Sequence, residues 1–156
     1  MGHSDIGGYT TIKVPYLDGH LDYVRSKELL LRWIEMNAFS DMIMRTHIGV
    51  IPADMYQVWS DSNTTEFFST FVKIHVSLKS YKMKLMDEAE SEGVPPLRSL
   101  LLEYPEDKTA VKIKDQFMLG TDLLMAPIFK KDSTERHVYL PQGKWTHFFT
   151  KEVHDF

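Results

Sequence analysis

The stretch His3-Ser4-Asp5-Ile6-Gly7-Gly8-Tyr9 governs the interpretation of the whole chain. A carboxylate ends a short run that is typical of a β-strand, and two glycines then allow a sharp backbone turn that a side chain would obstruct. Tyr9 follows at once, so an acid and an aromatic ring share a loop with glycine hinges. This combination can hold a polar, disc-shaped ligand such as a sugar ring. The same residues are also consistent with an ordinary strand end followed by a Gly-Gly turn.

The composition indicates a folded globular protein. Of the 156 residues, 43% are hydrophobic and 12% aromatic, which suits one domain, or one domain and part of another. With 18 Lys and Arg against 22 Asp and Glu, the net charge is −4, and no basic cluster supports nucleic-acid binding. The absence of cysteine excludes disulfides and thiolate metal sites, and no apolar run is long enough to predict a membrane span. The histidines show no metal-ligand spacing, so we expect neither a zinc site nor another cofactor.

A first strand–loop–helix unit is predicted around the opening stretch. Residues 2–6 form the expected strand, and a loop containing Pro15, Asp18 and Gly19 follows it to about residue 23. Ser26 is the expected N-cap of a helix over residues 27–38, because its hydroxyl can accept an N–H of the first turn. The apolar residues of this helix recur at a spacing of three and four, which predicts one buried face.

A second unit of the same kind follows. Residues 41–45 predict a short buried strand, and a long polar loop comes after it. An apolar stripe then runs from Phe67 to Ala89 with helical spacing, and Gly93 ends it. Two successive strand–loop–helix units predict parallel strands covered by helices, which is an α/β architecture.

The pattern changes after residue 97. Short runs typical of β-strands occur at residues 100–102, 123–126, 138–140 and 145–149, and prolines and glycines separate them. Regular short strands with turn residues between them predict an antiparallel β-domain. We therefore expect a boundary near residue 105, with an α/β part over 1–105 and the beginning of a β-domain over 106–156.

Candidate binding residues stand at the ends of the two predicted parallel strands, where α/β proteins bind ligands. Asp5 ends the first strand and can accept hydrogen bonds from sugar hydroxyls. Arg45 and His47 end the second, where the arginine can pair with an acid and the histidine can donate to a hydroxyl. Each also has a structural interpretation: Asp5 as a loop cap, Arg45 as an ion-pair partner and His47 as a core histidine. Their shared position at one rim favours a binding site.

Several motifs can be compared with known families. They are SDIGGY at 4–9, RSKELLLRW at 25–33, AF at 38–39, MRTH at 44–47, LR at 97–98, EYP at 103–105, DQFMLG at 115–120, LLMAP at 123–127, YLP at 139–141 and GKW at 143–145. In this order, and over nearly the whole chain, they resemble glycoside hydrolase family 31, the α-glucosidase family. The segments GYTT at 8–11 and MRTHIG at 44–49 resemble its sulfoquinovosidase-like branch most.

The resemblance implies a fold and a reaction. The fold is the last two strand–helix units of an eight-stranded β/α (TIM) barrel followed by the start of an antiparallel β-sandwich. The reaction is retaining hydrolysis of an α-glycoside or sulfoglycoside by two carboxylates. Asp5 and Arg45 would then belong to the polar lining of the pocket, His47 would bind sugar hydroxyls, and Tyr9 would line the pocket and help to hold a sulfonate.

The resemblance also implies that no residue of this chain is catalytic. In the family both catalytic aspartates precede the motif that begins here at Ser4, so we expect the chain to be a fragment without its nucleophile and acid/base. Asp5 is therefore assigned neither role. Asp41 and Ser99 stand where family members usually have proline, which loosens local turns without touching the rim.

Three functional interpretations remain open from the sequence. The chain is an inactive piece of an α-glycosidase, a catalytically inactive carbohydrate-binding or interaction module, or a structural β-rich domain without a ligand. A piece of a barrel would leave a sheet edge and apolar helix faces uncovered, so we expect this polypeptide alone to be unstable or to associate with other material.

Overall fold

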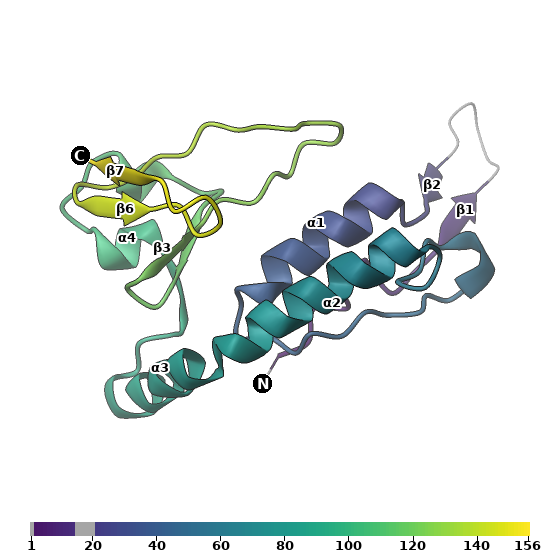
Figure 1. Ribbon diagram of the computed structural model, residues 1–156, viewed down its shortest axis with the longest axis horizontal. Coiled ribbons are helices and arrows are strands. Elements are labelled where there is room, and N and C mark those ends of the chain that lie inside the picture. Colours follow the sequence, from purple (N-terminus) through teal and green to yellow (C-terminus); the bar gives the residue numbers. More distant parts are fainter. Residues whose placement is uncertain (1, 15–20) are drawn as a thin grey trace.

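A computed structural model describes residues 2–14 and 21–156 of the chain (Figure 1). It is a mixed α/β structure in which every named strand pairs antiparallel. None of the helices in these residues is long and apolar enough to cross a membrane. The elements, in order, are β1 Ile12–Val14, β2 Leu21–Tyr23, α1 Lys27–Ala38, a 3₁₀ turn Pro52–Asp54, α2 Ser62–Ser77, α3 Lys79–Glu92, β3 Leu97–Ser99, α4 Leu100–Glu103, a second 3₁₀ turn Ala110–Lys112, β4 Phe117–Leu119, β5 Leu123–Met125, β6 Lys144–Thr146 and β7 Val153–Asp155.

Helix α1 has the predicted bounds and the predicted cap. The Ser26 hydroxyl accepts the backbone N–H of Leu29 at 3.2 Å. The expected face is buried, with Leu30, Ile34 and Asn37 almost inaccessible to solvent. This face packs against α2 and against Ile6, so the apolar spacing of the sequence is confirmed as the origin of the first core.

In place of the two predicted parallel strands, the described residues contain one isolated parallel β-bridge. Residues 2–6 and 41–45 are not strands, which corrects the sequence prediction, but a parallel bridge joins Ile6 to Thr46. The His47 N–H donates to the Ile6 carbonyl at 3.4 Å, and the Ile43 N–H donates to the Gly2 carbonyl at 3.1 Å. The predicted direction is therefore confirmed. Two short extended segments without further neighbours do not build a regular ladder, since isolated strand pairs are only marginally stable.

The loop predicted between the first strand and α1 contains a β-hairpin instead. Strands β1 and β2 pair antiparallel, with Ile12 opposite Tyr23 at the base. The predicted turn residues Pro15, Asp18 and Gly19 lie outside the residues that the structure describes.

The predicted long helix is two helices. Helix α2 ends at Ser77 and α3 begins at Lys79, with Leu78 between them. The Ser77 hydroxyl donates to the Ile74 carbonyl at 2.7 Å, a local bond of the kind that bends helices. Beyond this break the apolar stripe continues to Leu85, which is buried. Gly93 then ends α3 in the left-handed conformation (φ 73°), as the sequence predicts.

The C-terminal part contains two small antiparallel sheets, β3-β4-β5 and β6-β7. The antiparallel character is confirmed, but two predicted strands are wrong. Residues 100–102 lie in helix α4, and residues 138–140 pair with no strand of the described chain. The physical reason is visible at Tyr139, whose N–H and carbonyl both bond the side-chain amide of buried Gln116 at 2.8 Å. A side chain thus replaces the neighbouring strand. The division at residue 105 stays a prediction.

A buried arginine connects this part to the helices. Arg98, the middle residue of β3, meets Glu103 of α4 at 2.6 Å and Glu88 of α3 at 2.7 Å. Burial alone would lower the pKa of Arg98, but the hydrogen bonds that it donates to Glu103 and Glu88 raise it. Two apolar cores lie on either side of this link, one around α1 and α2 and one around Leu100, Ala110 and Met118.

Candidate functional site

The predicted site lies where the two parallel segments end. Asp5 directly precedes Ile6, and His47 directly follows Thr46, so the candidate residues flank the Ile6–Thr46 bridge on adjacent segments. Ile6 itself is completely buried, which anchors both segments to the core. The chain therefore leaves the core at this point as two neighbouring loops, one through Asp5 and Tyr9 and the other through His47.

Asp5 occupies a turn that holds its carboxylate at the surface. Its backbone has φ 50°, in the left-handed region that aspartate tolerates better than most residues, and its carbonyl accepts the Gly8 N–H. The carboxylate contacts the His3 ring, with 2.8 Å between Oδ1 and Nδ1, and remains partly exposed. It can thus accept further hydrogen bonds from an outside ligand through its second oxygen.

Tyr9 and His47 are in contact. Their ring centroids lie 6.2 Å apart with an interplanar angle of 78°, which is an edge-on aromatic arrangement. Tyr9 is 58% exposed, so most of its ring faces solvent. Two candidate residues from different loops therefore share one surface.

The tautomer of His47 follows from its local hydrogen bond. Its Nδ1 accepts the backbone N–H of Gly49 at 3.0 Å, so in the neutral ring the proton sits on Nε2. The Nε2–H then remains as a donor for a hydroxyl or another acceptor. Gly49 itself has φ 88°, a left-handed conformation that favours glycine.

Arg45 is exposed and separate from the other three. Its side chain makes no hydrogen bond or ion pair with any residue in the described part of the chain. It does not pair with Asp5, whose carboxylate contacts His3 instead. The structure thus brings Tyr9 and His47 together and places Asp5 on the same loop as Tyr9. It leaves the Arg45 guanidinium at the surface without a bonding partner among residues 2–14 and 21–156.

Arg25 is the residue of this region that the sequence interpretation missed. It lies just before the N-cap of α1 and is only 2% exposed. Its guanidinium donates to the carbonyls of His47 at 2.6 Å and Tyr56 at 2.7 Å, and to the side chain of Gln57 at 2.8 Å. Burial lowers its pKa from the ordinary value. No sequence motif marks an arginine that binds backbone carbonyls far along the chain.

Gly7 is the one feature of the opening motif that is explained by the position of Arg25. A Cβ atom at Gly7 would overlap the Arg25 side chain and would lie 3.1 Å from a methyl of Leu30. The opening motif therefore needs a glycine here for close approach as well as for its positive φ of 85°.

The long loop after His47 is ordered by the same network. Gln57 is buried, and its amide group donates to the carbonyls of Ile48 at 2.7 Å and Pro52 at 3.1 Å. Tyr56 bonds Asp61 through its hydroxyl, whereas Trp59 is 65% exposed. The hydrogen bonds from Lys27 and from the Thr64 N–H lower the pKa of Asp61.

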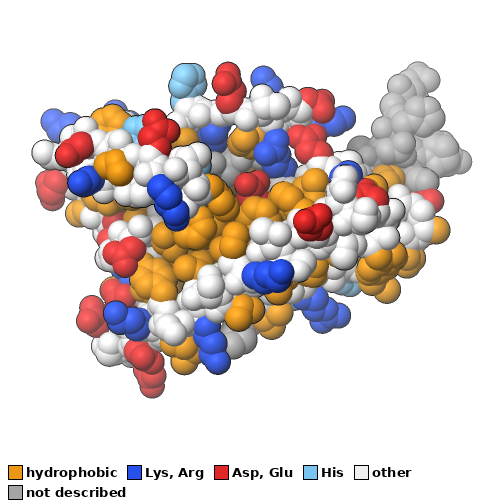
Figure 2. All heavy atoms as spheres, viewed as in Figure 1, with side chains coloured by type: hydrophobic (Ala, Val, Ile, Leu, Met, Phe, Trp, Pro, Cys, Tyr) orange, Lys and Arg blue, Asp and Glu red, His pale blue; other side chains and the backbone are white. Residues whose placement is uncertain are grey.

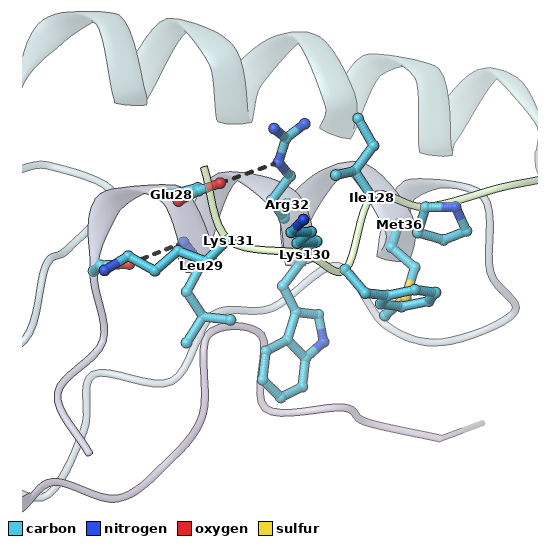
Figure 3. Close-up of a pocket in the computed structure, with 11 residues that line it drawn as sticks. Glu28, Leu29, Arg32, Met36, Ile128, Lys130 and Lys131 are labelled. Atoms are coloured by element: carbon cyan, nitrogen blue, oxygen red, sulfur yellow. Dashed lines mark hydrogen bonds and ion pairs between the residues drawn. The ribbon is translucent and has the colours of Figure 1, made fainter. Parts of the chain in front are cut away.

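A separate cavity of about 460 Å³ lies between α1 and residues 127–131 (Figure 3). Leu29, Trp33 and Met36 of α1 form one wall, and Ile128 and Phe129 form the other. Charged side chains line its edge, including the pair Glu28 and Arg32, which is drawn with a dashed line in Figure 3. None of the four predicted site residues lines it.

The described residues contain no group of three or more His, Asp or Glu side chains that could hold a metal ion. The chemistry available at the candidate site is therefore hydrogen bonding by Asp5 and His47, stacking on Tyr9, and charge pairing with Arg45. These are the interactions that bind a polar ring with hydroxyl groups.

Comparison with known proteins gives a consistent result. Residues 93–156 match the family described as glycosyl hydrolase family 31 C-terminal domain. The sulfoquinovosidase of Escherichia coli is 38% identical over 153 residues, and that of Agrobacterium fabrum is 37% identical over 153 residues. A solved family 31 sulfoquinovosidase from E. rectale, in complex with an aza-sugar inhibitor, superposes with a TM-score of 0.85 at 37% identity.

The alignments cover nearly all of this chain but only a small part of each relative. The alignments include 98% of this chain for the E. coli enzyme, 97% for the A. fabrum enzyme and 98% for the solved structure. They include only 21%, 22% and 22% of those proteins, respectively. The chain therefore spans about a fifth of the length of the relatives that it matches.

Proposed function

Because the chain belongs to glycoside hydrolase family 31, we propose that it forms part of the sugar-binding pocket of a retaining α-glycosidase. The observation that carries this proposal is the contact between Tyr9 and His47 beside the Ile6–Thr46 bridge. It joins an exposed aromatic face to a ring with a free N–H donor, and both lie at the carboxyl ends of parallel-paired segments. Ligands of barrel enzymes bind at such ends.

Each residue has a distinct part in the proposed pocket. Tyr9 packs against the sugar ring, the Nε2–H of His47 donates to a sugar hydroxyl, and Asp5 accepts from another. Arg45 carries a guanidinium with no partner among the described residues, and it is suited to a bidentate contact with an anionic substituent. The sulfonate of a sulfoquinovoside is such a group, so sulfoquinovosides and α-glucosides are the proposed substrate class.

The proposal places the reacting carboxylates outside these 156 residues. A retaining glycosidase needs one carboxylate as nucleophile and a second as acid and then base. Asp5 contacts His3 and sits on the rim, where it serves binding. In the same proposal, residues 1 to about 96 are the last two strand–helix units of a β/α barrel, and the C-terminal part begins a β-sandwich. The coverage of about a fifth of each relative supports the first statement, and the match of residues 93–156 to the family's C-terminal domain supports the second.

The experiment uses the protein that the complete natural reading frame encodes. We expect this reading frame to encode, outside the 156 residues, a Trp-x-Asp segment and a Gly-Asp segment that carry the two catalytic aspartates. Hydrolysis of 4-nitrophenyl α-sulfoquinovoside and 4-nitrophenyl α-glucoside is then compared between wild type and His47→Asn. In this variant the asparagine oxygen can still accept the Gly49 N–H, while the Nε2–H donor is lost.

We expect His47→Asn to lower kcat/KM by about ten- to a thousandfold, because a lost hydrogen bond to a polar substrate group is worth about 1.5–4 kcal/mol. The matched control is His137→Asn, at an exposed histidine in the C-terminal part. Equal kinetics for wild type and His47→Asn would remove His47 from the site. Saturable sugar binding without any hydrolysis would instead favour the second function, an inactive carbohydrate-binding module.

A further inference from the structure

Arg25 is a buried cation whose bonding partners are all neutral among the described residues. Its Nε donates to the Tyr56 carbonyl, one terminal nitrogen donates to the His47 carbonyl, and the other donates to the Gln57 side-chain oxygen. Longer bonds of 3.4 and 3.5 Å reach the carbonyls of Ile6 and Gly8. A buried arginine that serves only the core is usually paired with a carboxylate, as Arg98 is with Glu88 and Glu103.

These acceptors come from two loops, the second of which contributes at two places along its length. Ile6 and Gly8 enclose Gly7 in the turn between Asp5 and Tyr9, and His47 begins the second loop. Tyr56 and Gln57 lie farther along this same loop, after the 3₁₀ turn Pro52–Asp54. One planar guanidinium therefore lies beneath both candidate binding loops and ties the first loop to two points of the second. The planar fork of arginine can hold several acceptors in fixed directions, which a lysine ammonium cannot do.

The bonds also fix the two residues that meet at the surface. Arg25 holds the carbonyl of His47 itself, and it holds the carbonyl of Gly8, which is joined by the peptide bond to Tyr9. Each of these carbonyls belongs to a half-buried residue, and the guanidinium provides it with a donor. The separation of the Tyr9 and His47 rings thus depends on a side chain that itself does not reach the exposed surface.

We propose that Arg25 is a positioning residue for the sugar site, which sets the relative placement of Tyr9 and His47 by binding the backbone of both loops. The proposal rests on the function proposed above, because it assigns the purpose of the arrangement to sugar binding. Arg25 touches no substrate. It acts by holding the donor of His47 and the face of Tyr9 in one geometry before the sugar arrives, which reduces the ordering cost of binding.

The first readout is the contact itself and needs no sugar. In the complete natural gene product, with selectively labelled histidine and tyrosine rings, nuclear Overhauser cross-peaks are measured between Tyr9 and His47. Arg25→Met is expected to lose these cross-peaks while the methyl signals of Leu30 and Ile34 stay in place. Arg25→Lys is expected to fold and to keep them at reduced intensity, and it carries the test if the methionine variant does not fold.

The second readout is kinetic. Arg25→Lys is expected to lower kcat/KM for 4-nitrophenyl α-sulfoquinovoside by about tenfold or more, roughly the loss of one or two hydrogen bonds to a charged group. The matched control is Arg32→Lys, since Arg32 on α1 bonds only Glu28 and the Ser133 carbonyl among the described residues. It is expected to leave both readouts unchanged.

The possible outcomes separate the two proposals. If the Tyr9–His47 cross-peaks are unchanged in Arg25→Lys and Arg25→Met, or if Arg32→Lys weakens them equally, Arg25 is not a positioning residue. If the cross-peaks respond as expected but no sugar is bound or hydrolysed by the wild type, the loops are positioned by Arg25 and the proposed function is wrong.

Discussion

At the scale of single residues, Gly7 and Gly8 are required for different reasons. A glycine can be needed for a positive φ or for lack of space for a Cβ atom, and only Gly7 meets both conditions. Both have positive φ, 85° and 83°, so an alanine at either position costs about 1–2 kcal/mol in backbone strain. They differ in space, because a Cβ at Gly7 would overlap Arg25, whereas a Cβ at Gly8 would have no atom within 4 Å. Gly7 therefore serves both conformation and close approach.

We predict that Gly7→Ala destabilises the protein clearly more than Gly8→Ala. The common backbone strain cancels in the comparison, and the remaining difference is the cost of displacing Arg25 from its carbonyl partners. The measurement is urea unfolding of both variants and the wild type in the complete gene product. Equal losses of stability would show that Arg25 can move aside without cost, and they would weaken its proposed role.

The residue scale also shows what the sequence can predict about a site. The neighbourhood of Tyr9 and His47 could be predicted because both follow the two extended segments that the Ile6–Thr46 bridge joins, and such segments are local features of the sequence. The bond from Arg25 to His47 joins residues 22 positions apart, and nothing in the neighbouring sequence marks it. Such a contact depends on how the loops pack on the start of α1, so it becomes visible only in the folded chain.

At the scale of elements, the junction of α2 and α3 contains a half-buried lysine. Lys82 donates to the carbonyl of Ala38, the last residue of α1, at 3.2 Å and lies 2.8 Å from the Nδ1 of His75. Burial lowers the pKa of Lys82 from 10.5 to about 8, and the charge of Asp41 opposes this shift. Burial, and then the charge of Lys82, lower the pKa of His75 as well.

The sign of the pH effect follows from the lowered pKa of Lys82. Between about pH 8 and pH 10.5 the unfolded chain binds a proton at Lys82 that the folded chain has lost, so stability from this group rises with pH. We predict that the Tm of wild type rises relative to that of Lys82→Met over this range. Lys84→Met, on the exposed side of α3, is the control and should run parallel to wild type. Parallel profiles for Lys82→Met would contradict the prediction.

Helices were more predictable from this sequence than strands. The apolar spacing and the Ser26 cap predicted α1 with its observed bounds, because both are properties of one continuous segment. The segment at residues 138–140 has strand-like composition, yet Gln116 occupies the hydrogen bonds that a strand would need. Strand formation depends on an available neighbour, and composition does not report whether one is present.

At the scale of the whole molecule, the chain exposes more surface than its mass predicts. The accessible surface is 10540 Å². A compact monomer of 18.2 kDa would expose about 8,100 Å². Figure 2 shows hydrophobic side chains gathered at the surface where the C-terminal part meets the helices. An excess of this size is comparable to the area that a stable protein–protein interface buries.

We therefore predict that the 156-residue polypeptide alone self-associates or unfolds without a sharp transition. The apolar cavity wall of Leu29, Trp33 and Met36 on α1 is part of the surface that would need covering. Sedimentation velocity and a thermal melt test this directly. A soluble monomer with one cooperative unfolding transition would show that the exposed apolar surface is tolerated, and that no further polypeptide is needed to cover it.

The most direct measurement is a crystal structure of the complete gene product with 4-nitrophenyl α-sulfoquinovoside bound to a catalytically inactive variant. We predict that the sugar ring packs against Tyr9 and that one of its hydroxyls accepts a hydrogen bond from the Nε2 of His47, with Arg25 unmoved beneath both loops. A sugar bound elsewhere, for instance in the cavity beside Trp33 and Phe129, with Tyr9 and His47 facing only solvent, would contradict the proposed pocket.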